Sequence, residues 1–144
     1  MKIKNVEKFA EINAIVNFLI YECKINSLCK ISFLSLSIYN NNFKLTSLIG
    51  GVNKYELMEK LIKYSQIKNI STNEDYVYIL NMLNILQIKK FITIQDGIIT
   101  TCKESAFKNY DACKYLSCDL KQIILKEVNT FSDESFMSEV MKYV

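Results

Sequence analysis

The chain contains no histidine, no arginine, no proline and no tryptophan, and only three of its 144 residues are glycine. Histidine is the usual acid–base catalyst near neutral pH, so its absence excludes Ser-His-Asp and Cys-His catalytic sites. No glycine-rich phosphate loop is present, because the Gly50-Gly51 pair is not followed by Lys-Ser or Lys-Thr. Without arginine, an arginine finger is also excluded. We therefore expect a chain that is not an enzyme, with no catalytic residues, no cofactor and no small-molecule ligand.

The cysteines do not indicate a metal site. Their number is odd, no two are spaced as C-x-x-C, and without histidine a zinc ion would need four thiolates or carboxylates. We expect them to be small, buried, reduced residues. The five are Cys23, Cys29, Cys102, Cys113 and Cys118.

Two pairs of adjacent carboxylates, Glu74-Asp75 and Asp133-Glu134, could serve as a metal-binding or acid–base pair. Each pair also stands at the start of a predicted helix, where acidic side chains stabilise the positive end of the helix dipole. We favour this structural role for both pairs.

Length and hydropathy predict a single compact unit without a membrane segment. Half of the residues are hydrophobic and the formal net charge is +3. A chain of 144 residues can bury a core without metals or disulfides. The most apolar early run, Ile12 to Ile20, is interrupted by Asn13 and Asn17 and is shorter than the ~18 residues of a membrane span. We find no cleavage site for export and expect a cytoplasmic protein.

The N-terminal part predicts a helix from Phe9, followed by an ambiguous segment. Leu28 to Tyr39 fits a helix by one set of apolar residues and a strand by another, because leucine and serine alternate there. Gly50-Gly51 is the best hinge candidate, and a second helical block begins at Asn53. The first helix is defined by Ile12, Ile15, Val16, Leu19, Ile20 and Cys23.

A third helix begins near Thr72, because Ser71 and Glu74 form a capping box. Its apolar spacing predicts an inner face of Tyr76, Val77, Leu80, Leu83 and Leu86. Its predicted outward residues are Tyr78, Asn81, Met82, Ile85 and Gln87.

Two short strands follow this helix directly. Residues 91–94 and 98–101 are rich in isoleucine and threonine, and Asp96-Gly97 between them favours a type I′ turn. A capped helix running into a tight hairpin is typical of the recognition helix and wing of a winged-helix domain. We therefore predict a mainly α fold with a small β-hairpin, winged-helix-like, with N- and C-terminal helical extensions.

The predicted organisation has three parts, which can all belong to one domain. Residues 1–49 form an N-terminal helical segment, 50–104 form the winged-helix-like core with its wing at 91–101, and 105–144 form C-terminal helices that pack on the core. The C-terminal part divides near Ser117, and its last helix is capped at Thr130 or Ser132.

The predicted recognition helix is poorly suited to DNA. Such helices contact bases mainly through their N-terminal residues, and here these include Glu74 and Asp75, while Asp96 lies at the wing tip. Lysines elsewhere could still contact the phosphate backbone, although a run of lysines more often forms a solvated helix face. The candidate DNA-backbone contacts are Lys54, Lys60, Lys63, Lys68, Lys89 and Lys90.

Apolar residues in excess of one helix face favour a protein partner instead. Exposed apolar patches usually mark protein interfaces, where aromatic residues and methionine are enriched. The alternative is that the N- and C-terminal helices cover these residues within one chain. The candidate interface residues are Phe18, Tyr21, Tyr78, Met82 and Ile85.

The order of these segments resembles a known family. The runs Glu11–Tyr21 and Ile31–Tyr39, the winged-helix-like part and the final Phe136–Val144 resemble, in this order, the middle component of bacterial ABC-type three-component (Lamassu-like) anti-phage defence systems. The resemblance consists of hydrophobic patterns and assigns no site residues.

The resemblance implies a non-enzymatic adaptor that bridges the heads of an SMC-like (Rad50-like) ATPase and an effector nuclease. Its partners would be these two subunits, with weak or indirect DNA contact. Two alternatives remain open: a winged-helix DNA-binding regulator, and a kleisin-interacting winged-helix subunit of a chromosome-condensing complex.

Overall fold

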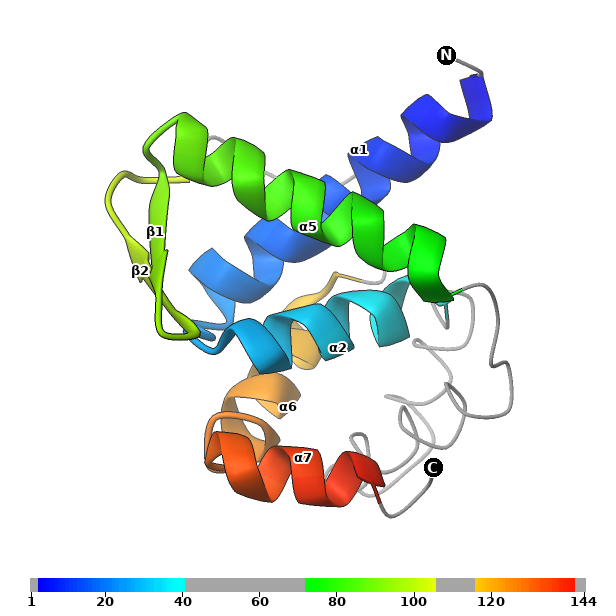
Figure 1. Cartoon of the computed structure of the whole chain (residues 1–144). Coiled ribbons are helices and arrows are strands. Elements are labelled where there is room, and N and C mark those ends of the chain that lie inside the picture. The colour runs from blue at the N-terminus through cyan, green and yellow to red at the C-terminus, as the bar shows by residue number, and fades with distance from the viewer. Residues whose placement is uncertain (1–2, 41–71, 106–115, 142–144) are drawn as a thin grey trace.

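The computed structural model describes residues 3–40, 72–105 and 116–141 (Figure 1). The predicted hinge at Gly50-Gly51, the helical block from Asn53 and residues 106–115 of the predicted C-terminal helices lie outside these ranges. The described elements are, in chain order, α1 (Ile3–Asn17), η1 (Phe18–Glu22), α2 (Leu28–Asn40), α5 (Thr72–Ile88), β1 (Ile92–Gln95), β2 (Ile98–Thr101), α6 (Cys118–Glu127) and α7 (Asp133–Met141).

The first helix begins at Ile3, earlier than the predicted start at Phe9, and ends in a π-helical turn, η1. In this turn the Cys23 amide donates to the Phe18 carbonyl at 3.0 Å. Asn17, which is buried at the junction, donates from Nδ2 to the Asn13 carbonyl at 2.8 Å. The buried amide is thus satisfied locally, and the apolar residues around it enter the core on more than one side.

The ambiguous segment after it is a helix, α2. The alternation of leucine and serine does not separate a buried face from an exposed one, because both kinds of residue are buried. Leu34 and Leu36 enter the core, and so do Ser35 and Ser37. Helix α2 packs against α1, α5 and α7. A helix covered on several sides loses the one-sided apolar stripe by which sequence patterns are recognised.

The hairpin forms as predicted. Strands β1 and β2 pair antiparallel, with Ile94 opposite Ile99 and Gln95 opposite Ile98. The connecting residues Asp96 and Gly97 have φ values of 53° and 77°, as a type I′ turn requires.

A third segment extends this small sheet. Ser27, between η1 and α2, bridges to Ile98. On either side of the bridge the Leu28 amide donates to the Gly97 carbonyl at 2.9 Å, and the Ile99 amide donates to the Asn26 carbonyl at 2.7 Å. The connection between the first two helices therefore covers one edge of the hairpin.

The C-terminal helices are capped by serines. Ser117 caps α6 by accepting from the Leu120 amide at 3.1 Å, and Ser132 accepts from the Ser135 amide at 3.1 Å. The second bond decides between the two predicted caps of the last helix in favour of Ser132.

Polar contacts tie these helices to the N-terminal half. Lys121 of α6 pairs with Glu22 at 3.2 Å, Asn129 donates to the Cys23 carbonyl at 2.8 Å, and the buried Lys30 donates to the carbonyl of Phe131. All named helices from α1 to α7, together with both strands, contribute to one hydrophobic cluster.

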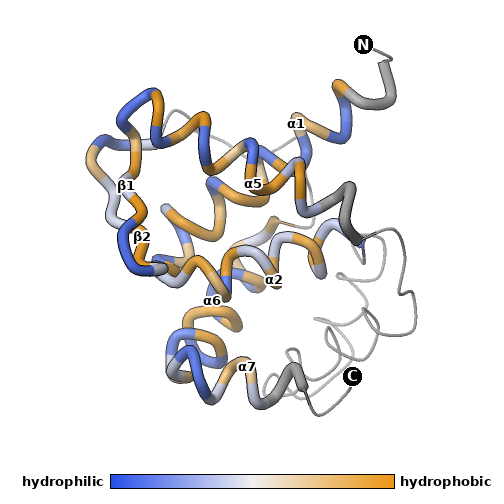
Figure 2. The backbone as a smooth tube through the Cα atoms, viewed as in Figure 1, coloured by the Kyte–Doolittle hydropathy of each residue, from blue (hydrophilic) through white to orange (hydrophobic). Residues whose placement is uncertain are grey.

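The described chain is thus mainly helical with a two-stranded antiparallel hairpin, as the sequence predicts. Its N-terminal helices share one core with α5 and the hairpin. In Figure 2 hydrophobic and hydrophilic residues alternate along α5, which crosses in front of α1. Among the helices of the described ranges, none is long and apolar enough to span a membrane.

Candidate functional site

Helix α5 is rotated relative to the orientation that its sequence predicts. Its buried residues are Ile79, Met82, Leu83 and Leu86, which face α1 and α2. Val77 and Leu80, predicted to face inward, are 54% and 53% exposed, whereas Met82, predicted to face outward, is 2% exposed. The prediction was wrong for these three residues because apolar residues occur on every side of this helix.

The exposed side of α5 forms a surface that we call the α5 outer face. Its apolar members include Ile88, which is 70% exposed, and its two polar members carry amides rather than charges. Between Tyr76 and Ile88 the helix has no lysine, aspartate or glutamate. The face consists of Val77, Leu80, Asn81, Asn84 and Ile88.

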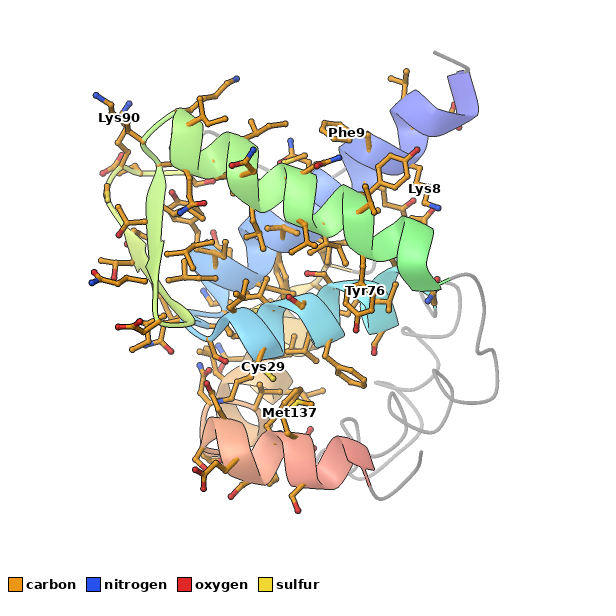
Figure 3. The ribbon with its side chains drawn as sticks, in the orientation of Figure 1. Lys8, Phe9, Cys29, Tyr76, Lys90 and Met137 are labelled. Atoms are coloured by element: carbon orange, nitrogen blue, oxygen red, sulfur yellow. The ribbon has the colours of Figure 1, made fainter. Side chains whose placement is uncertain are left out.

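Tyr78 anchors the N-terminal half of α5 to its neighbours. Its ring meets that of Phe9 edge-on, with centroids 6.3 Å apart. The Lys8 ammonium lies 5.1 Å from the Tyr78 ring centroid and 5.5 Å from that of Tyr39, so this one cation links α1, α2 and α5. Figure 3 shows Lys8 and Phe9 beside the first half of α5. Tyr78, a predicted interface residue, is thus half-buried in an internal contact.

The end of α5 is set by a Schellman motif. The Lys90 amide donates to the Gln87 carbonyl at 3.0 Å, and the Phe91 amide donates to the Leu86 carbonyl at 2.9 Å. Lys90 adopts a positive φ of 65°, a conformation that usually favours glycine. This turn directs the chain from α5 straight into the hairpin and leaves Lys89 and Lys90 exposed.

The base of the hairpin is held by Tyr21 and Lys103. The Tyr21 hydroxyl donates to the Lys103 carbonyl at 2.9 Å. The Lys103 ammonium lies 5.3 Å from the Phe91 ring centroid and donates to the Lys89 carbonyl at 3.1 Å. Burial, followed by the charge of nearby Cys102, raises the pKa of the Tyr21 hydroxyl. Tyr21 therefore fixes the hairpin against η1.

The predicted site residues consequently separate into four groups. Phe18 and Met82 are buried in the core, so their interpretation as exposed apolar residues was wrong. Tyr21, Tyr78 and Ile85 are half-buried. Lys89 and Lys90 are exposed, and the remaining predicted DNA-backbone contacts, Lys54, Lys60, Lys63 and Lys68, lie outside the described residues.

Sequence reasoning missed Val77, Leu80 and Ile88 as surface residues. A signal was present, because Asn81 and Asn84 mark the solvent side of α5, and Val77 and Ile88 each stand four residues from one of them. Taking the polar residues as the reference for the outward direction would have found the α5 outer face.

The cysteines lie in different environments. Cys23 and Cys29 are buried and half-buried, but Cys102 and Cys118 are exposed, which corrects the expectation of burial for these two. Cys113 lies outside the described residues. Burial raises the pKa of the Cys23 thiol to about 12. Within residues 3–40, 72–105 and 116–141, no group of three histidine, cysteine or acidic side chains could hold a metal ion.

Comparison with protein-family models, with curated proteins and with solved structures finds no match for this chain.

Proposed function

We propose that this chain is a non-catalytic, winged-helix-like interaction subunit that docks onto another protein through the α5 outer face. The observation that carries the proposal is the exposure of Val77, Leu80 and Ile88 on a helix face without charge. Exposed apolar groups gathered on one face are typical of a protein interface.

The order of elements supports the winged-helix-like arrangement. Among the described residues, α1 and α2 precede α5 and are joined through a segment that pairs with the hairpin, and α5 leads directly into β1 and β2. In a winged-helix domain the helix before the wing presents its outer side to the ligand. Here that side offers aliphatic groups and amides, which suit a protein better than a polyanion.

Burial of the α5 outer face would release appreciable free energy. A fully buried aliphatic side chain contributes about 1.5–3 kcal/mol. Val77 and Leu80 are half exposed and Ile88 is more exposed, so each would contribute roughly 1–2 kcal/mol on docking. A few such side chains can dominate the affinity of an interface.

The resemblance to the middle component of three-component defence systems suggests the partner. We propose that the partner is the SMC-like ATPase subunit, with the effector nuclease held in the same complex. A kleisin-type subunit of a chromosome-condensing complex is the second protein partner to test.

The experiment is co-expression of this chain with an SMC-like coiled-coil ATPase from the same genome, followed by affinity purification of the complex. Leu80→Lys should weaken the complex by about tenfold or more, because it places a charge in an apolar contact. Met137→Lys is the matched control, since Met137 is a 40% exposed apolar residue on α7. Equal retention of the ATPase by both variants, or its failure to bind the unmodified chain, would reject the proposal.

A DNA-binding regulator is the second candidate function. Lys89 and Lys90 are exposed where α5 meets the hairpin, and the amides of Asn81 and Asn84 have the donor and acceptor pair that can read adenine. The absence of cations along the α5 outer face is the evidence against it. If the chain binds duplex DNA, Lys89→Glu with Lys90→Glu should weaken DNA binding and reduce its salt dependence. Lys126→Glu on α6 should change neither.

A further inference from the structure

We propose that two copies of this chain pair through their α5 outer faces, with the two helices antiparallel. The residues at the centre of this face are arranged symmetrically along the helix. Val77 and Ile88 stand at its ends, and Asn81 and Asn84 stand between them at spacings of four, three and four residues. The pattern of apolar, amide, amide and apolar residues reads the same in both directions.

This symmetry is what a two-fold interface requires. Around an axis that passes between Met82 and Leu83, Val77 of one copy lies opposite Ile88 of the second copy. Asn81 likewise lies opposite Asn84 of the second copy. In such an interface the same patch meets itself, so it must be self-complementary. The spacing of α5 meets this condition for Val77, Ile88 and the two asparagines, and it places the exposed Leu80 opposite the half-buried Ile85 of the second copy.

The chemistry of the amides also fits a contact with itself. Each asparagine side chain both donates and accepts hydrogen bonds, so Asn81 can pair with Asn84 of the second copy without any other residue type. No lysine, aspartate or glutamate lies between Tyr76 and Ile88. Like charges would therefore not face each other across the axis, as they would on an ordinary charged helix surface.

The helix ends have opposite charges in the sequence. Lys89 and Lys90 follow α5 at its C-terminal end, and its first turn carries Glu74 and Asp75. An antiparallel pair brings the basic end of one copy alongside the acidic end of the other. A parallel pair would bring like charges together at both ends. Charge complementarity thus favours the antiparallel arrangement.

The size of the contact sets its strength. At about 1.5 Å per residue, the stripe from Val77 to Ile88 is roughly 16 Å long, and it is one helix wide. A stable complex usually buries about 800 Å² on each partner, which a single helix face of this length does not reach. The pair should therefore be reversible and populated only at high protein concentration.

The dimer occupies the face that the proposed function assigns to a partner protein, so the two would exclude each other. The dimer itself does not depend on that partner.

The test compares two double variants of the full chain by sedimentation equilibrium. Asn81→Lys with Asn84→Lys places like charges opposite each other in the antiparallel pair. Asn81→Lys with Asn84→Glu instead places a lysine opposite a glutamate at both positions. The second variant should dimerise at least about tenfold more tightly than the first. It is a matched control, because it changes the same two exposed sites.

A mixing experiment adds a second readout. Mixing the Asn81→Lys, Asn84→Lys variant with an Asn81→Glu, Asn84→Glu variant should give a mixed dimer, although neither variant should dimerise by itself. The proposal is overturned if the unmodified chain stays monomeric up to about 1 mM. It is also overturned if Asn81→Lys with Asn84→Lys dimerises as tightly as Asn81→Lys with Asn84→Glu. Two results together would support both proposals: Leu80→Lys loses ATPase binding, and Asn81→Lys with Asn84→Glu dimerises more tightly than Asn81→Lys with Asn84→Lys. Each proposal can fail without the other.

Discussion

The orientation of α5 can be tested by replacing two residues of nearly equal size with alanine. Met82→Ala and Leu80→Ala remove side chains two positions apart on the same helix. The structure buries Met82 and leaves Leu80 about half exposed, whereas the apolar spacing of the sequence predicts the reverse. The two variants therefore give opposite rankings under the two orientations.

The expected difference is large. Truncating a fully buried methionine to alanine costs about 2–5 kcal/mol, because contacts are lost and a cavity remains. Leu80 buries only about half of its surface, and alanine is a slightly better helix former than leucine. We expect Leu80→Ala to cost about 1 kcal/mol or less.

Urea denaturation followed by far-UV circular dichroism is the suitable assay, because the chain has no tryptophan to report unfolding by fluorescence. For a chain of this size, 1 kcal/mol corresponds to a shift of about 2–4 °C in Tm, so thermal scans would resolve the two variants as well. If Leu80→Ala were as destabilising as Met82→Ala, the rotation of α5, and with it the α5 outer face, would be refuted.

Four further predictions concern the thiols, the hairpin turn and its anchor. Because burial raises the pKa of Cys23 from 9.0 to about 12, the unfolded chain loses this proton first, so stability should fall between pH 9 and 12; denaturation of Cys23→Ala should show a smaller fall. At pH 8 a thiol reagent should modify the exposed Cys102 quickly and Cys23 only after unfolding, as peptide mass mapping would show. Gly97→Ala should lower the free energy of unfolding in urea by about 1–2 kcal/mol, because alanine is strained at the Gly97 φ of 77°. The added Cβ meets nothing within 4 Å, so no steric clash adds to this cost. An unchanged free energy of unfolding would contradict the type I′ turn. Tyr21→Phe should cost about 0.5–1.5 kcal/mol, because it removes the hydrogen bond to Lys103, and an unchanged midpoint would count against that bond.

Local signals predicted the elements of this fold well. Asp96-Gly97 specifies its turn because few residue pairs tolerate positive φ at two successive positions, and Ser117 provides a cap whose effect extends over only three residues. The start of α5 at Thr72 agrees with the predicted start. The π turn at Phe18–Glu22 had no such signal, since its residues would fit an ordinary helix equally well.

The exposed side of α5 was harder to predict than the elements of the fold. Phe18 and Met82 are the kind of residue that either a core or an interface selects, and only their neighbours in space distinguish the two. Helix α1 and helix α2 together cover the side of α5 that carries Met82.

The sequence by itself determined where α5, α6, α7 and the hairpin lie and excluded chemistry by histidine or arginine side chains of this chain, because these follow from residue type and from contacts within a few positions. Only the tertiary structure decided that 28–40 is a helix, that Ser27 pairs with the hairpin, and that Val77, Leu80 and Ile88 face outward. Burial depends on which distant helices cover a residue, and an α5 that is apolar on all sides leaves that choice to its neighbours.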